Sequence, residues 1–467
     1  MKKATVFFTL ALAALILFVS CGEDPFFHDV TVTDRDKVTT EIVFNGNEYT
    51  LPANSDAEFL GWKVNDEKYI KAAGEKVTIN GETSIKAIYT DTEDDTICLL
   101  MYVLSDSNYT GSFTDSTKKT VLVPTDKIIL PEGSEMKSNG GNFDGWYTAE
   151  DADGNRKYYE GGSEITVTSF TKLYANWTDP KLKYETVSET DSSYKVSSND
   201  DTATSYKISE WYKGKKVTVI APNGFQNNTT FTEITIPKTI ETIGEEAFGK
   251  NWLSPNAATA LTTVTFAKDS ALKTIDKYAF QKCTGLTSCN LPSGLETIEE
   301  RAFCECDLTG KIVIPASVAS LKDYAFDSNS NLTEVEFEEG SQITAISDGA
   351  FKYCSISSIV LPETVTSIGD LSFYETELTS IVIPSAVTSI GYMAFAYCPL
   401  TEVEIGSSIS TISEYAFCQC KSLVSIKINK SADDISNMGG FNYKWSYNSA
   451  SYNTNITVYD ASGAKVK

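Results

Sequence analysis

The stretch LTSIVIPSAVTSIGYMAF, residues Leu378–Phe395, decides the fold, because nearly the same sequence motif precedes and follows it. SISSIVLPETVTSIGDLSF precedes it at Ser355–Phe373, and PLTEVEIGSSISTISEYAF follows it at Pro399–Phe417. The closing phenylalanine recurs at intervals of 22, 23 or 25 residues, with a single interval of 32, at Phe225, Phe248, Phe280, Phe303, Phe326, Phe351, Phe373, Phe395 and Phe417. A fixed period in this range predicts a solenoid, in which each coil buries its apolar face against its neighbours.

Each coil carries an apolar pair with one residue between its members, which is the period of a short strand with one buried face. We expect these pairs to be buried: Ile234/Ile236, Val264/Phe266, Cys289/Leu291, Ile312/Ile314, Val335/Phe337, Ile359/Leu361, Ile381/Ile383, Val403/Ile405 and Ile426/Ile428. A proline follows the pair in five coils and ends the strand, since it lacks the N–H that a sheet requires. The Ala-Phe segment is typical of a single helical turn. The sequence therefore predicts a mainly β solenoid of about nine coils of 22–25 residues with short helical turns.

Two small β modules are predicted before the solenoid, because words of the first recur in the second. TLPAN at Thr50–Asn54 is echoed by ILPEG at Ile129–Gly133, and the Gly-Trp pair that ends in Trp62 is echoed by the pair that ends in Trp146. We expect both tryptophans in the core, since one indole dominates burial in so small a domain.

The N-terminus is typical of an exported protein. Lys2 and Lys3 precede an uncharged run from Ala4 to Ser20, which has the charged and apolar regions of a secretory signal and is short for a membrane span. Cys21 follows small residues at the end of this run. The segment resembles the bacterial lipoprotein signal, which implies that Cys21 is lipidated and becomes the first mature residue. The alternative is an ordinary signal peptide with an incidental cysteine.

The recurring Ile-Pro, Ile-Gly and Ala-Phe-x-x-Cys words resemble the BspA-like, or Treponema-type, leucine-rich repeat family over about residues 206–428. That family is displayed on bacterial surfaces. The sequence departs from the pattern by an insertion at Gly249–Ala260, which we expect to be a loop, and by Glu338 and Gly406 in place of proline. The two N-terminal modules resemble the Listeria–Bacteroides repeat, the internalin-type B-repeat, which implies a β-grasp-like fold; the first copy lacks the closing tryptophan that the second has at Trp177.

These signals predict the following division of the chain: a signal peptide at 1–20, a lipidated tether at 21–36, β module 1 at 37–92, β module 2 at 96–179, an N-terminal cap of the solenoid at 181–211, the solenoid at 212–430 and a C-terminal cap at 431–467. We expect the N-terminal cap to be a polar hairpin. A polar C-terminal cap is required because the last coil would otherwise expose its apolar face.

The cysteines indicate structural thiols. Nine remain when Cys21 is set aside, an odd number that a complete set of internal disulfides cannot use. Five stand three residues after a marker phenylalanine, where other coils have asparagine or threonine, and so we expect small buried side chains near backbone polar groups: Cys283, Cys306, Cys354, Cys398 and Cys420. Disulfides between neighbouring coils (Cys283 with Cys306, Cys398 with Cys420) remain open in an exported protein.

Charge and residue types argue against several function classes. The net charge of −24, or −26 once Lys2 and Lys3 are removed, disfavours binding to nucleic acid and to anionic lipid. His28 is the only histidine, which excludes histidine-dependent triads and multi-histidine metal sites. The segment 150–162 is rich in acidic residues, but Arg156 and Gly162 stand where a calcium loop needs glycine and glutamate, so we interpret it as a hairpin tip. We expect no enzyme, catalytic residue, cofactor or metal.

A binding face is predicted from the residues between the members of the buried pairs, which line one side of the stack: Thr235, Thr265, Asn290, Val313, Glu336, Val360, Val382, Glu404 and Lys427. Val360 and Val382 fall in consecutive coils, and exposed valines in a row indicate a protein contact or a covered face. The competing interpretation is β-propensity at a half-exposed position. Aromatic residues are few in this column, which disfavours a carbohydrate-binding module.

The sequence and the resemblance together imply a surface lipoprotein that recognises proteins of a host or of neighbouring bacterial cells. We expect it to be exported and lipid-anchored to the bacterial outer membrane or cell surface, touching the membrane only through Cys21. The alternative is an architectural envelope lipoprotein with no external ligand.

Overall fold

The computed structural model describes residues from Phe27 onward, apart from 35–36, 45–46, 57–58, 66–69, 72, 79–82, 90–97, 104–110, 114–119, 124–126, 153–154, 168–170, 251–259, 439–446, 449–450, 453–455 and 467. The predicted signal peptide, Cys21 and nearly all of the predicted insertion loop lie outside the described residues. The described part has no helix that is long and apolar enough to cross a membrane. The chain divides into two compact units, one of residues 1–139 and 145–176 and one of residues 140–144 and 177–467.

The N-terminal part contains two sheets with the same strand order. The first has the order β2 (Lys37–Phe44), β1 (Phe27–Asp34), β7 (Thr83–Tyr89), β4 (Phe59–Val64) and β5 (Ile70–Lys71). The second has the order β10 (Thr120–Val123), β8 (Cys98–Val103), β16 (Thr171–Thr178), β13 (Asn142–Tyr147) and β14 (Tyr158–Tyr159). In both, the first strand of the module runs parallel to the last, β1 to β7 and β8 to β16. The echo in the sequence therefore corresponds to a repeated topology.

Smaller elements accompany each sheet. A separate two-stranded sheet joins β3 (Glu48–Thr50) to β6 (Lys76–Thr78) in the first module and β11 (Lys127–Ile129) to β15 (Glu164–Thr166) in the second. The second module adds the pair β9 (Gly111–Phe113) and β12 (Met136–Ser138) and the short 3-10 helix η1 (Gly133–Glu135).

Within each module, the repeated Leu-Pro and Gly-Trp motifs contact each other. Trp62 is buried and its Nε1–H donates to the carbonyl of Pro52 at 2.9 Å, and Trp146 is buried and donates to the carbonyl of Pro131 at 2.9 Å. A buried indole N–H needs such a partner. The prediction that both tryptophans are core residues is confirmed, and the Leu-Pro word recurs because its proline carbonyl is the acceptor.

One stretch differs from the expectation. Residues 27–34, which we assigned to a tether, form β1 and pair with both β2 and β7. Val30 and Val32 are buried at alternate positions of this strand, so a period-two pattern was present in a segment too short to stand out.

The segment 150–162 contains the expected hairpin tip, between β13 and β14, and β14 itself. The Thr148 N–H donates to the carbonyl of Lys157, and the Asn155 N–H donates to Asp151 Oδ1 at 2.8 Å. These bonds close the connection between β13 and β14. Asp153 lies outside the described residues.

The second unit begins with the hairpin predicted to cap the solenoid. β17 (Leu182–Thr186) pairs antiparallel with β18 (Tyr194–Ser198), and β18 pairs parallel with β20 (Lys215–Ile220) of the first coil, which also pairs with β19 (Trp211–Tyr212). Val196 of β18 is fully buried. The hairpin thus covers the apolar end of the stack.

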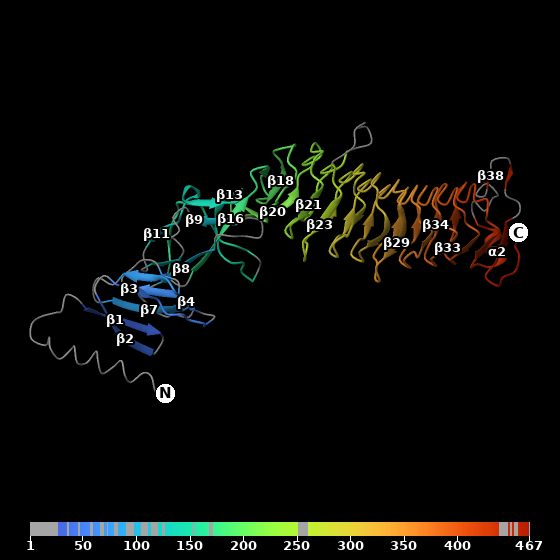
Figure 1. Ribbon diagram of the computed structural model, residues 1–467. Helices are drawn as coiled ribbons and strands as arrows, with labels where there is room; N and C mark the ends of the chain where they lie inside the picture. The colour runs from blue at the N-terminus through green and yellow to red at the C-terminus, as the bar shows by residue number, and fades with distance from the viewer. Residues whose placement is uncertain are drawn as a thin grey trace, which may run out of the picture. The chain divides into compact units, whose positions relative to one another are not determined.

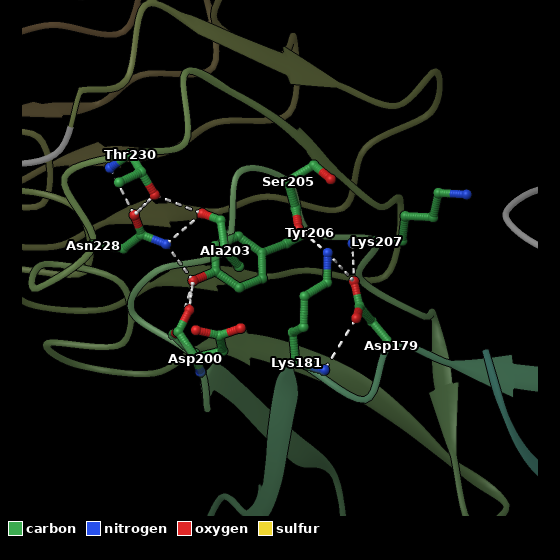
Figure 2. Close-up of polar contacts among 10 residues, drawn as sticks. Asp179, Lys181, Asp200, Ala203, Ser205, Tyr206, Lys207, Asn228 and Thr230 are labelled. Atoms are coloured by element: carbon green, nitrogen blue, oxygen red, sulfur yellow. Dashed lines mark hydrogen bonds and ion pairs between the residues drawn. The ribbon is translucent and has the colours of Figure 1, made fainter. Parts of the chain in front are cut away.

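A polar network fastens this cap to the first coil (Figure 2). The Asp179 carboxylate accepts the N–H groups of Lys181 at 3.0 Å and Lys207 at 2.9 Å. Deeper in the coil, the buried Asn228 amide donates to the Ala203 carbonyl at 2.7 Å and to Tyr206 Oη at 2.6 Å. Asn228 stands where other coils have cysteine, three residues after a marker phenylalanine.

The coils stack so that equivalent strands pair in parallel, and Figure 1 shows them as successive short arrows. One face is formed by three consecutive sheets: β21 (Glu233–Ile236), β23 (Thr263–Phe266) and β25 (Ser288–Cys289); then β27 (Gly310–Ile314), β29 (Leu332–Phe337) and β31 (Ser358–Ile359); then β33 (Ser380–Ile383), β35 (Glu402–Ile405), β37 (Ser425–Ile428) and β40 (Thr457–Tyr459). We call this the strand face.

A second side of each coil carries two-residue strands. They are β22 (Thr242–Ile243), β24 (Thr274–Ile275), β26 (Thr297–Ile298), β28 (Ser320–Leu321), β30 (Ala345–Ile346), β32 (Ser367–Ile368), β34 (Ser389–Ile390) and β36 (Thr411–Ile412). The isoleucines and the leucine of these strands point into the core, where they meet the buried pairs of the strand face. Of the predicted pairs, only Phe266, Leu291, Phe337 and Ile359 are half-buried rather than buried.

The marker phenylalanines form one column through the core. All are buried, and neighbouring rings from Phe225 to Phe417 stack with centroids 5.1–5.8 Å apart. Each interplanar angle is at most 19°. The interval between phenylalanines therefore sets the stacking register of the coils.

The predicted helical turn at the Ala-Phe segment is wrong. In the coil of Phe280, Tyr278 and Lys282 have left-handed φ angles of 59° and 62°. The backbone N–H groups of Tyr278, Phe280 and Lys282 donate to carbonyls of the next coil. An isolated helical turn fixes many dihedral angles for a single hydrogen bond. Bonds to the next coil satisfy these groups instead, and they offset the cost of the left-handed residues. We call the side made by these segments the turn face.

The cysteine column is confirmed as structural. The eight cysteines of the solenoid, residues 212–430, are free, and all are buried. The Cys398 and Cys420 thiols donate to the carbonyls of Phe373 and Phe395, the markers of the preceding coils, at 3.1 and 3.0 Å. Asn329 does the same with Phe303 at 2.8 Å, which explains why these residue types interchange.

The chain continues the stack beyond the last marker. The helix α2 (Ala432–Ser436) is capped by Ser431, whose hydroxyl accepts the Asp434 N–H, and β40 then pairs parallel with β37. Ile435 and Val458 are buried against the last coil, and β38 (Tyr447–Asn448) pairs with β39 (Ser451–Tyr452). The tail thus adds a strand of its own to the strand face.

Candidate interaction surface

The nine predicted face residues lie in one column on the strand face. Within each sheet the strands pair in register, so that Thr235 lies beside Thr265, Val313 beside Glu336, and Val382 beside Glu404. Asn290 and Val360 directly follow the last residues of β25 and β31. Seven of the nine are exposed; Glu404 and Lys427 are half-buried and pair with each other, with Lys427 Nζ donating to Glu404 Oε1 at 2.9 Å. The structure thus shows the exposure of these residues and the contacts among them, and their role as a binding face stays a prediction.

Three valines are the apolar part of this column. Val360 is 85 % exposed, Val382 is 64 % exposed and Val313 is 36 % exposed. A β-branched residue suits a strand, but in the described residues nothing covers the Val360 side chain. An apolar side chain so open to water gains free energy when a partner buries it.

Val360 lies in a groove of 690 Å³ on the strand face. The groove spans β29 and β31 and the segments that follow each strand, residues 334–341 and 358–364. Half-buried Phe337 and Ile359 lie beside the exposed Val360, and the three side chains form the apolar part of the groove. β31 is only two residues long, whereas β29 has six, and the sheet ends at β31.

The rim of the groove is acidic. Its lining contains five glutamates and no lysine, arginine or histidine: Glu334, Glu336, Glu338, Glu339 and Glu363. Outside the groove, Lys311 Nζ lies 3.4 Å from Glu334 Oε1 and also contacts Glu336. Glu338 Oε2 accepts the Ala316 N–H at 3.0 Å.

Two of these carboxylates are available to a ligand. Glu339 and Glu363 are exposed, and neither forms an ion pair within the described residues. Glu338 replaces the proline that ends the equivalent strand in other coils, and this substitution was the one sign in the sequence that the surface of this coil differs from that of the others. The groove itself was missed, because Glu339 and Glu363 belong to different coils and come together only through the strand register.

Exposed and half-buried aromatic residues gather on the turn face, which the sequence reasoning also missed. Tyr353 and Tyr374 lie with ring centroids 5.5 Å apart, and Tyr374 and Tyr397 lie 5.3 Å apart. Lys352 Nζ lies 4.6 Å from the Tyr353 ring. Burial, with the carboxylate of Glu375 nearby, raises the pKa of Tyr374 to about 12, so this ring stays neutral. The aromatics absent from the valine column are thus present on another side of the same coils.

The described residues contain no group of three or more histidine, cysteine, aspartate or glutamate side chains placed to hold a metal ion. Cys304 lies between Gln281 and Asp327, whose amide nitrogen and carboxylate oxygen are 3.5 and 3.8 Å from its sulfur. Burial raises the pKa of the Cys304 thiol to about 12, which keeps it protonated and a poor metal ligand or nucleophile at neutral pH.

Comparison with known proteins gives a family match over the solenoid. The sequence profile described as "BspA type Leucine rich repeat region" matches in six copies, at residues 200–269, 255–371 and 344–462. No curated protein matches the chain.

Solved structures with some likeness are bacterial leucine-rich repeat proteins. One from Bacteroides ovatus is 22 % identical, with a TM-score of 0.42, and the match covers 54 % of this chain and 71 % of that one. A leucine rich cell surface protein from Faecalibacterium prausnitzii is 22 % identical, with a TM-score of 0.38, over 54 % of this chain and 82 % of that one. A T. pallidum leucine rich repeat protein is 17 % identical, with a TM-score of 0.32, over 52 % of this chain and 88 % of that one.

Proposed function

Since the chain belongs to the BspA-type leucine-rich repeat family, whose profile matches more than half of it, we propose that it is a non-catalytic surface lipoprotein that binds a protein of a host or of a neighbouring cell. Proteins of this family are typically found at the cell surface, and the family suggests protein–protein interaction. Adhesion through the strand face is the finer role proposed for this chain.

The observation that supports this role is the pair of valines Val360 and Val382 on consecutive coils, 85 % and 64 % exposed. Burying a valine side chain contributes about 1.5 kcal/mol or more to association. Interfaces are built around such apolar centres with a polar rim, and the flanking glutamates would form that rim.

Anchoring at Cys21 is part of the proposal. Lys2 and Lys3, the uncharged run and the small residues before Cys21 support it at the level of the sequence. The two N-terminal modules enter the proposal as B-repeats, supported by the Leu-Pro and Gly-Trp words that both contain.

Protease treatment of intact cells tests the location. We expect the protein to be digested while a periplasmic control protein in the same cells survives. If the protein is protected in intact cells and digested only after lysis, it faces the periplasm, adhesion is refuted, and an architectural role in the envelope takes its place.

A double variant tests the surface. Val360→Lys with Val382→Lys places two charges at the centre of the column, and we expect it to abolish saturable binding of the protein to its target cells. Thr235→Lys with Thr265→Lys is the matched control, because it adds the same charges to exposed positions on the same face, several coils away. Equal binding by the valine variant and the unmodified protein would refute the strand face as the binding surface.

A further inference from the structure

We propose that the groove between β29 and β31 binds a cationic, extended segment of the partner protein, with an apolar side chain against Val360 and lysine or arginine beside Glu339 and Glu363. This inference rests on the proposed function and names the chemistry of the partner.

The apolar part of the groove fits one side chain of moderate size. Val360 projects from the strand face with 85 % of its surface exposed, and Phe337 and Ile359 beside it are only half-buried. The volume of 690 Å³ lies in the range of about 300–1,000 Å³ that is usual for ligand pockets. An apolar residue of a partner would remove water from all three side chains.

The charge of the groove selects a cation. Five glutamates line it with no basic residue among them, and Lys311 contacts only Glu334 and Glu336. Exposed Glu339 and Glu363 therefore remain to pair with lysine or arginine of a partner. A second copy of this chain is a poor occupant, since two molecules with a net charge of −24 repel each other.

The strand geometry sets the spacing of the partner's residues. Side chains at i, i+2 and i+4 of an extended segment point the same way, at intervals of roughly 6.6 Å. A Lys-x-Val-x-Lys pattern would therefore present its valine and both lysines to the groove together. The same pattern with serine instead of valine keeps the charge and loses the apolar contact.

The probe is a fluorescent peptide of three tandem Lys-Ser-Val-Ser-Lys units, titrated with the purified full chain at low salt. We expect saturable binding that weakens at high salt, because the attraction is between exposed charges. A peptide with serine for valine should bind about tenfold more weakly, and a peptide with glutamate for lysine should not bind.

Paired variants locate the site. Glu339→Gln with Glu363→Gln should weaken binding of the probe about tenfold. Glu233→Gln with Glu245→Gln is the matched control, because it removes the same charge from exposed positions of the solenoid several coils away, and it should leave binding nearly unchanged. All four positions are exposed, so we expect circular dichroism and melting curves like those of the unmodified protein.

Three outcomes would overturn the inference: no binding of the cationic probe, equal losses in the groove variant and its control, or equal binding of the valine and serine peptides. Equal losses would mean that the peptide senses only the total charge. The titration uses purified protein, so its failure is separate from that of the proposed function. If protease digests the protein on intact cells but the probe does not bind, the groove alone is refuted. If the probe binds but the protein is protected on intact cells, the surface role alone is refuted.

Discussion

Phe373→Ala removes one ring from the middle of the phenylalanine column. The Phe373 side chain is fully buried, with ring centroids 5.7 Å from Phe351 and 5.2 Å from Phe395. Its backbone N–H donates to Ala394 and its carbonyl accepts the Cys398 thiol, and the substitution leaves both groups in place. The change therefore tests side-chain packing with the backbone ladder retained.

The expected cost is about 3–5 kcal/mol of unfolding free energy, the usual range for a buried phenylalanine replaced by alanine. Stacking contributes part of this, since each aromatic pair adds roughly 0.5–1.5 kcal/mol beyond the area buried. Phe373→Leu fills most of the space and loses both ring contacts, so we expect a cost of about 1–2 kcal/mol.

Denaturant titrations followed by far-UV circular dichroism measure both variants against the unmodified protein. Val360→Ala is the matched control, because it lies in the same coil, is exposed, and should change stability by about 0.5 kcal/mol or less. Coils contact only their neighbours, so hydrogen exchange should increase most in the two coils next to Phe373.

An unchanged midpoint for Phe373→Ala would refute the role of the column. A cost for Phe373→Leu equal to that of the alanine variant would mean that filling the space is unimportant and that the ring contacts carry the whole effect.

Three other changes test the remaining contacts. Burial raises the pKa of Asp327 above its unfolded value of about 3.9, so ionisation of this carboxyl destabilises the fold at every pH above the raised pKa. Asp327→Asn should therefore raise the melting temperature at pH 7, and the gain should shrink as the pH falls towards 4. A gain that does not depend on pH would contradict this account. Burial raises the pKa of the Cys398 thiol to about 11, so a thiol reagent at pH 8 should modify it only after unfolding, and rapid reaction of the native protein would show that the column is open to solvent. Trp146→Phe leaves the Pro131 carbonyl without its donor and should lower the free energy of unfolding, measured by urea denaturation, by about 1–3 kcal/mol. Trp62→Phe should lower it by a similar amount, and a loss of stability in only one of the two variants would contradict the equivalence of the two modules.

The interior of the solenoid was largely predictable from the sequence. The interval between Phe373 and Phe395 is the length of one coil, and neighbouring coils place equivalent residues side by side. Cys398 and Asn329 share a column with the same acceptor, the marker carbonyl of the preceding coil, and their interchange in the sequence indicated a polar backbone group nearby.

The strand β1 and the turns show where local patterns were insufficient. The alternation at Val30 and Val32 is short, and its burial depends on β7, which lies about fifty residues further along the chain. The Ala-Phe segment has the composition of a helical turn, but the N–H groups of Tyr278 and Lys282 reach carbonyls of the next coil, and those acceptors are not encoded within the segment itself.

The sequence by itself determined the period, the inward residues and the column that faces solvent, because each of these depends on spacing within one coil or between adjacent coils. Only the tertiary structure decided the shape and charge of the surface. Glu339 and Glu363 border one groove because β29 and β31 pair in a particular register, and the sheet ends at the two-residue strand β31. A repeated pattern places a residue inside or outside, whereas a binding surface depends on where the coils differ from one another.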